Sequence, residues 1–217
     1  MRNFTMTEQV RDYAAARSSW PPDEVVERLR STTQALGGVA GMQIGDDQGQ
    51  LLTMMARLVG ARRAVEVGTF TGYSSLCIAR GLEEGGSLLC CDISEEWTAI
   101  GVRAWKESGL ADRIELRLGP ALQTLRALPV EAVLDLVFID ADKTGYAGYW
   151  QELVPRVRPG GVLLVDNVLW SGRVIDQADT DSDTQALRSF NDAVARDDRV
   201  EVVLLTAFDG LTIARKL

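Results

Sequence analysis

Histidine is absent from all 217 residues of this chain. Its absence excludes a Ser-His-Asp or Cys-His catalytic triad and any zinc site built on imidazole. A general base would therefore have to be a lysine, aspartate, glutamate, tyrosine or cysteine. A metal ion would have to be held by oxygen atoms, which favours Mg²⁺, Ca²⁺ or Mn²⁺.

Cysteine is scarce, and long apolar runs are missing. The three cysteines, Cys77, Cys90 and Cys91, form no CxxC pair, so we expect core residues and neither disulfides nor zinc ligands. No apolar run approaches the roughly 20 residues that span a bilayer. Residues 1–4 lead into a polar stretch and not into the apolar region of a signal peptide. We therefore expect a cytoplasmic protein without membrane contact.

The charge balance is acidic. A net charge of −8 and a pI near 4.7 argue against binding to nucleic acid, whose phosphates would be repelled. Hydrophobic residues make up 46% of the chain, which is enough for a sizeable core. The length suits one domain.

Strand and helix patterns alternate through the middle of the chain. After an irregular opening, we expect helices from Pro21 to Ala35 and from Asp46 to Val59. Five buried strands are predicted at 63–67, 87–91, 114–118, 134–139 and 162–165, with helices at 74–82, after Ser94, at 121–128 and at 146–157. A polar loop at 171–181 and a helix to Ala195 precede two strands, 200–207 and 211–215, joined by a tight Asp209-Gly210 turn. The pattern predicts an α/β protein whose parallel sheet ends in an antiparallel hairpin.

A glycine turn follows the first strand. Gly68 stands between that strand and the next helix, which is the usual place for an adenosine ligand. The second glycine of a dinucleotide motif is replaced by Phe70, whose side chain would obstruct a pyrophosphate. Asp92 ends the second strand, near the usual position of an acid that binds ribose hydroxyls. The sequence favours an adenosine ligand without a pyrophosphate. A structural turn beside a helix-capping aspartate is the alternative.

Acidic residues end two further strands. Asp140 follows the fourth strand, and Asp166 and Asn167 follow the fifth. Ligands bind outside the carboxyl ends of strands in open α/β sheets, so these side chains should converge if the strands are neighbours. Such oxygen ligands suit Mg²⁺, and Lys143 lies one short turn away. Taken singly, Asp166-Asn167 could be a solvated turn and Lys143 a surface lysine. Their joint occurrence with Asp140 and the glycine turn favours a site.

These segments resemble the cation-dependent O-methyltransferases of the catechol and caffeoyl-CoA type. The resemblance covers roughly residue 41 to the C-terminus, and residues 1–40 match poorly. Its most specific segments are FIDADK at 138–143 and DNVLW at 166–170. It is also carried by EVGTFTGYS at 66–74, MQIGDDQGQ at 42–50 and DGLTIARK at 209–216.

The resemblance implies a single class I methyltransferase domain over residues 1–217, with a Rossmann-like seven-stranded sheet and helices on both faces. Residues 1–40 would form a helical extension that shapes the substrate site or a homodimer, and residues 41–217 the cofactor and metal core. The implied reaction is Mg²⁺-dependent methyl transfer from S-adenosylmethionine to a hydroxyl of a small vicinal-dihydroxy aromatic compound, catechol-like or caffeoyl-like. Pro120 and Gln123 depart from the family pattern, and the proline removes one N–H donor.

By the same resemblance, each site residue receives a role. Lys143 would be catalytic, and Asp140, Asp166 and Asn167 would hold the metal. The substrate would meet Met42, Lys143 and Trp170. The cofactor would contact Ile44, Glu66, Gly68, Thr69, Tyr73, Ser74, Asp92, Ile93, Ala121 and Asp140.

Other aromatic residues could line a slot for a flat ring, and the polar loop at 171–181 is the expected lid. The aromatic candidates besides Trp170 are Trp20, Tyr146, Tyr149 and Trp150. Three other interpretations stay open: an NAD(P)-dependent oxidoreductase, a phosphorylation receiver, and a binding protein that has lost activity. Phe70 and the terminal hairpin count against the first, the chain length against the second, and the intact acidic residues against the third.

Overall fold

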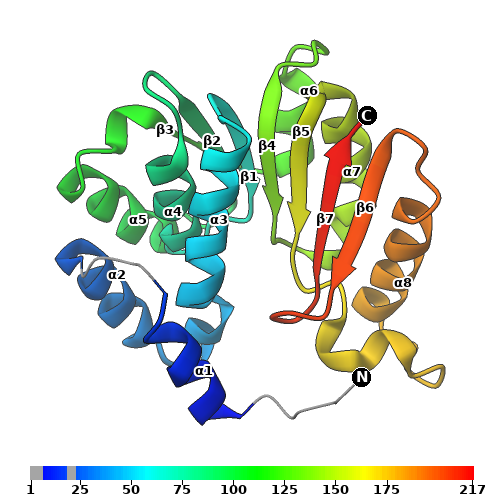
Figure 1. Ribbon diagram of the computed structural model, residues 1–217, viewed down its shortest axis with the longest axis horizontal. Coiled ribbons are helices and arrows are strands. Elements are labelled where there is room, and N and C mark those ends of the chain that lie inside the picture. Colours follow the sequence, from blue (N-terminus) through cyan, green and yellow to red (C-terminus); the bar gives the residue numbers. More distant parts are fainter. Residues whose placement is uncertain (1–6, 19–22) are drawn as a thin grey trace.

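A seven-stranded sheet runs through the middle of the protein, with strand order β3-β2-β1-β4-β5-β7-β6 (Figure 1). The computed structural model describes residues 7–18 and 23–217. β1 to β5 pair in parallel, and β7 lies antiparallel between β5 and β6, which confirms the predicted hairpin ending. The strands are β1 (Arg63–Val67), β2 (Ser87–Asp92), β3 (Ile114–Leu118), β4 (Leu134–Ile139), β5 (Val157–Val165), β6 (Val200–Leu205) and β7 (Leu211–Lys216).

Helices cover both faces of this sheet and bury a separate apolar core on each side (Figure 1). β4 shows why, since all its side chains are buried and alternate between the two cores: Val137 and Ile139 face one, Leu136 and Phe138 the other. The helices are α1 (Glu8–Ala15), α2 (Glu24–Gln34), α3 (Asp46–Leu58), α4 (Tyr73–Gly81), α5 (Glu95–Glu107), α6 (Ala121–Ala127), α7 (Tyr146–Leu153) and α8 (Ser182–Val194). Short 3₁₀ turns are η1 (Gly37–Met42), η2 (Ala111–Arg113), η3 (Lys143–Gly145), η4 (Val154–Arg156) and η5 (Trp170–Ile175).

The N-terminal part differs from expectation. α1 forms where an irregular opening was expected. α2 begins at Glu24, because the Asp23 carboxylate accepts hydrogen bonds from the backbone N–H groups of Val25 and Val26. Pro21 and Pro22, expected to open this helix, lie outside the described residues, as does Trp20.

The second half of the chain differs from the sequence prediction at three further places. α7 ends at Leu153, earlier than predicted, and β5 begins at Val157, also earlier than predicted. The strand is longer because it continues through Pro159-Gly160, where its pairing with β4 is irregular. The connection between β6 and β7 spans residues 206–210 and is not a tight two-residue turn. The expected polar loop at 171–181 is partly the 3₁₀ turn η5.

The cysteines behave as predicted. All three are buried and free, and burial raises the pKa of the Cys77 and Cys91 thiols to about 12. Among the residues that the structure describes, no helix is both long and apolar enough to cross a bilayer.

Candidate active site

A cavity of about 1350 Å³ lies at the carboxyl ends of β1, β4 and β5. This is the edge at which the strand order reverses direction, with β2 on one side of β1 and β4 on the other. Every residue that the sequence analysis assigned to a site lines this cavity except Glu66. These residues are Met42, Ile44, Gly68, Thr69, Tyr73, Ser74, Asp92, Ile93, Ala121, Asp140, Lys143, Asp166, Asn167 and Trp170.

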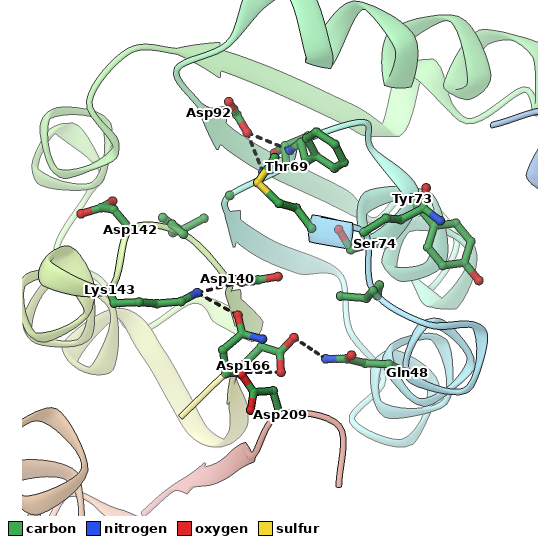
Figure 2. Close-up of a pocket in the computed structure, with 18 of the residues that line it drawn as sticks. Gln48, Thr69, Tyr73, Ser74, Asp92, Asp140, Asp142, Lys143, Asp166 and Asp209 are labelled. Atoms are coloured by element: carbon green, nitrogen blue, oxygen red, sulfur yellow. Dashed lines mark hydrogen bonds and ion pairs between the residues drawn. The ribbon is translucent and has the colours of Figure 1, made fainter. Parts of the chain in front are cut away.

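The glycine turn is held in place by Asp92 (Figure 2). Asp92 Oδ2 accepts hydrogen bonds from the backbone N–H groups of Thr69 and Phe70, each at 2.8 Å. Gly68 has φ +89°, and a Cβ at this position would lie 1.8 Å from the backbone oxygen of Asp140. Only glycine therefore lets the first turn pack against the end of β4. Phe70 lies on the cavity wall with its ring edge-on to Trp97.

Glu66 lies beneath this turn, fully buried and off the cavity wall. One carboxyl oxygen accepts hydrogen bonds from the hydroxyls of Ser75 and Thr69. Its other oxygen, Oε1, has no partner among the described residues. Burial raises the pKa of Glu66 from 4.5 to about 7 against the opposing effect of its hydroxyl neighbours. Its assignment to the cofactor stays a prediction.

At the other end of the cavity, the ammonium group of Lys143 bridges the ends of β4 and β5 (Figure 2). Lys143 Nζ donates to Asp140 Oδ1 at 3.1 Å and to Asn167 Oδ1 at 2.8 Å. Consecutive strand residues face opposite sides, yet Asp166 and Asn167 both line the cavity. They do so because the chain turns at Asn167, whose φ is +57°.

Burial makes the ionised forms of the Asp140 and Asp166 carboxylates costly. Burial, with the charge of Asp140 next in size, raises the pKa of Asp166 to about 6. Burial also raises the pKa of Asp140, although Lys143 opposes the shift. A bound cation would relieve both effects, because it neutralises acids that are costly to desolvate.

The donor set fits a hard cation such as Mg²⁺. Two carboxylates and one amide oxygen are ligands of the kind that Mg²⁺ takes, with water or substrate oxygens completing the octahedron. Within the described residues, no three His, Cys, Asp or Glu side chains are grouped to hold a metal. The candidate site therefore depends on the Asn167 amide oxygen as its third protein ligand.

Three further residues lie around Asp140, Asp166 and Lys143. The sequence predicts no role for Gln48 or Asp209, and it predicts Tyr146 only as a possible wall residue for a flat ring. Gln48 Nε2, from α3, donates to Asp166 Oδ2 at 2.7 Å (Figure 2). Asp209 points toward the cluster from the β6–β7 loop. Tyr146 Oη accepts from Lys143 Nζ at 2.7 Å and donates to the backbone oxygen of Asp166 at 3.0 Å. The only sequence signal for Gln48 and Asp209 is that each lies within a segment that resembles the family.

The aromatic candidates separate into wall and core. Trp170 lies on the wall, and Lys143 Nζ lies 5.5 Å from the centroid of its ring. Tyr149 also lines the cavity and donates a hydrogen bond to Asp142. Trp150 is a core residue, and Tyr146 is buried edge-on to Phe190, so neither offers a free face to a ring substrate.

Comparison with known proteins agrees with this geometry. Residues 16–217 match a family model described as O-methyltransferase. The chain is 39% identical over 174 residues to mouse catechol O-methyltransferase domain-containing protein 1, covering 79% of this chain and 66% of the mouse protein. It is 38% identical over 186 residues to maize caffeoyl-CoA O-methyltransferase 2, covering 81% and 70%.

Solved structures resemble the whole chain. An O-methyltransferase from Bacillus cereus, in complex with SAH, superposes with a TM-score of 0.88 at 31% identity, covering 96% of this chain and 97% of that one. The O-methyltransferase TomG from Streptomyces achromogenes, in complex with SAM, gives 0.87 at 31% identity, covering 97% and 99%.

Proposed function

Because this chain belongs to the O-methyltransferase family, we propose that it transfers a methyl group from S-adenosylmethionine to a hydroxyl of a small vicinal-dihydroxy aromatic compound, with Mg²⁺ bound. The bridge from Lys143 to Asp140 and Asn167, beside the glycine turn in one cavity, carries this proposal. Support for the methyl donor comes from the Bacillus and Streptomyces structures, which are complexes with SAH and SAM.

The cofactor end of the cavity suits a donor without phosphates. The turn at Gly68–Gly72 and the carboxylate of Asp92 form one wall, and Ile93 and Ala121 add apolar surface near them. Asp92 already accepts three backbone hydrogen bonds, from Thr69, Phe70 and Ser94, and its oxygens keep lone pairs for ribose hydroxyls. Phe70 leaves no glycine for a pyrophosphate, which counts against the NAD(P) alternative.

The end of the cavity that holds Asp140, Asp166 and Asn167 suits the chemistry of the methyl acceptor. Asp140, Asp166 and Asn167 would hold Mg²⁺, which would favour ionisation of the acceptor hydroxyl and orient it. Lys143 would accept the departing proton or stabilise the phenolate through its charge. Tyr146 and Asn167 fix the position of Nζ, so that this stabilisation is available without rearrangement. Trp170 would place the ring of the acceptor against the wall.

A metal-removal assay tests the proposed reaction. Transfer of labelled methyl from S-adenosylmethionine to a simple catechol should require added Mg²⁺ and stop in excess EDTA. Asp166→Ala should abolish the same metal-dependent transfer, and S-adenosylhomocysteine should still raise the melting temperature of that variant. Full turnover of the wild type in excess EDTA would refute the metal-dependent mechanism.

We also propose that the chain pairs as a homodimer, with residues 1–40 contributing to the dimer or to the substrate site. β6 is an edge strand, and Val203, Leu204 and Leu205 expose 56%, 39% and 36% of their surface. An apolar edge of this kind favours pairing with another chain. Light scattering of the wild type should give a molar mass twice that of one chain. The Val203→Lys variant should give the mass of a single chain. A wild type that scatters as a single chain would contradict this.

A further inference from the structure

The wall of the cavity is strongly acidic. Among the described residues it carries one basic side chain, Lys143, and seven carboxylates. Three of these, Asp92, Asp140 and Asp166, belong to the cofactor and metal ends described above. The other four are Asp47, Asp142, Asp183 and Asp209. A bound divalent cation would offset only part of this charge, so the potential in the cavity stays negative.

The arginines around the acceptor end bond to other groups, although Arg173 lies within Coulombic range of Asp183. Arg173 of η5 donates to Asp179 at 2.6 Å and lies 3.6 Å from Asp181. Arg188 of α8 donates to the backbone oxygens of Arg173 and Val174 in η5, the latter at 2.9 Å, and to that of Asp179 after it. Neither residue lines the cavity. The described wall therefore offers no guanidinium to a phosphate, although arginine is the usual partner of such groups.

Asp183 is the most available of these carboxylates at the acceptor end. It lies in the first turn of α8 and reaches the same cavity as Trp170 and the β6–β7 loop. Its side chain is half-buried and forms no hydrogen bond or ion pair with any described residue. Asp209, in contrast, accepts a hydrogen bond from the backbone of Ser171 and is partly committed to the fold. Asp183 thus offers an unpaired negative charge to a group carried by the acceptor.

From this arrangement we infer that the acceptor carries no phosphate and that Asp183 makes the cavity prefer an acceptor with a cationic tail. The inference rests on the proposed function, because it assigns a chemical class to the acceptor of that reaction. It separates this chain from its maize relative, which is named for a coenzyme A ester, a compound with several phosphate charges. Repulsion between those phosphates and the wall should exclude such an ester.

A matched series of diphenols tests this preference. The probes are catechols with a two-carbon tail that ends in an ammonium, a methyl or a carboxylate group, together with caffeoyl-CoA. Dissociation constants are measured by calorimetry in the dead-end complex with Mg²⁺ and S-adenosylhomocysteine, so the readout needs no turnover. Asp183→Asn is compared with Asp192→Asn, an exposed aspartate of the same helix that does not line the cavity.

The wild type should bind the ammonium probe most tightly, then the methyl, then the carboxylate, with caffeoyl-CoA weakest. Asp183→Asn should reduce the preference for ammonium over methyl by about three- to fivefold, the scale of one partly solvated charge pair. Asp192→Asn should leave it unchanged, and high salt should shrink it in the wild type.

Tighter binding of the carboxylate probe or of caffeoyl-CoA than of the methyl probe would overturn the inference. So would an unchanged ammonium preference in Asp183→Asn. If the binding order holds but no catechol is methylated, the proposed reaction fails and the charge preference stands. If no diphenol binds at all, the proposed function fails and the inference falls with it.

Discussion

Replacement of Glu66 by glutamine should change how the stability of the protein depends on pH. The pKa of this buried acid is about 7 in the folded protein against 4.5 for the free side chain. One pKa unit corresponds to about 1.4 kcal/mol, so the ionised form costs roughly 3 kcal/mol of the free energy of unfolding. Glutamine has nearly the same shape and cannot ionise, so it removes this cost while keeping an acceptor for Ser75 and Thr69.

The sign of the effect follows from the protons bound in each state. Below pH 4.5 both the folded and the unfolded chain hold the proton on Glu66. Between 4.5 and about 7 only the folded chain holds it, so stability falls as the pH rises through this window. Above about 7 both states have lost the proton, and this contribution becomes constant.

Urea unfolding in metal-free buffer measures the difference between the two proteins. Relative to Glu66→Gln, the wild type should lose roughly 2.5 kcal/mol of unfolding free energy between about pH 5 and about pH 8. Glu84→Gln, an exposed control, should give a curve parallel to the wild type. Parallel curves for Glu66→Gln and the wild type would show that this acid ionises normally and would refute the reasoning.

Three further substitutions probe the site. Lys143→Ala should slow methyl transfer by at least about 100-fold while hardly changing the dissociation constant of S-adenosylhomocysteine, and equal losses in both would remove its catalytic role. Tyr146→Phe, which deprives Lys143 Nζ of one partner, should lower kcat by about tenfold with little change in KM, and a rise in KM alone would contradict a positioning role. Gly68→Ala should abolish S-adenosylhomocysteine binding, because the new Cβ meets the backbone of Asp140. Gly85→Ala, which has a similar positive φ and open space around it, should only cost about 1 kcal/mol of unfolding free energy, and binding by Gly68→Ala would refute the packing argument.

The ends of the parallel strands were predictable from the sequence. Ile139 and Val165 each close an apolar run that a carboxylate follows at once, and Val67 ends a strand before the glycine turn, so the carboxyl edge of the sheet was predictable. Because parallel strands align these ends, the convergence of Asp140 with Asp166 and Asn167 followed from their order. The hairpin was likewise predicted, since β6 and β7 are separated only by a short glycine-containing segment.

Contacts between distant segments were not predictable. Gln48 reaches Asp166 across 118 residues, and no local pattern marks a glutamine in a helix as the partner of a strand-end carboxylate. The sequence allows Tyr146 to be a wall residue, because an aromatic side chain beside Lys143 has the same appearance in sequence whether it faces the core or the cavity. The burial of Glu66 beneath the glycine turn was not predictable either, because its place in the segment is the same whether its carboxyl faces the cavity or the interior. Its cofactor role stays a prediction.

Titration with Mn²⁺, followed by water-proton relaxation in the presence of S-adenosylhomocysteine, tests the oxygen site at the ends of β4 and β5 most directly. The wild type should bind one ion per chain, Asp166→Ala should bind none in the same concentration range, and Asp192→Asn should match the wild type. Undiminished binding of the ion by Asp166→Ala would contradict the placement of the metal among Asp140, Asp166 and Asn167.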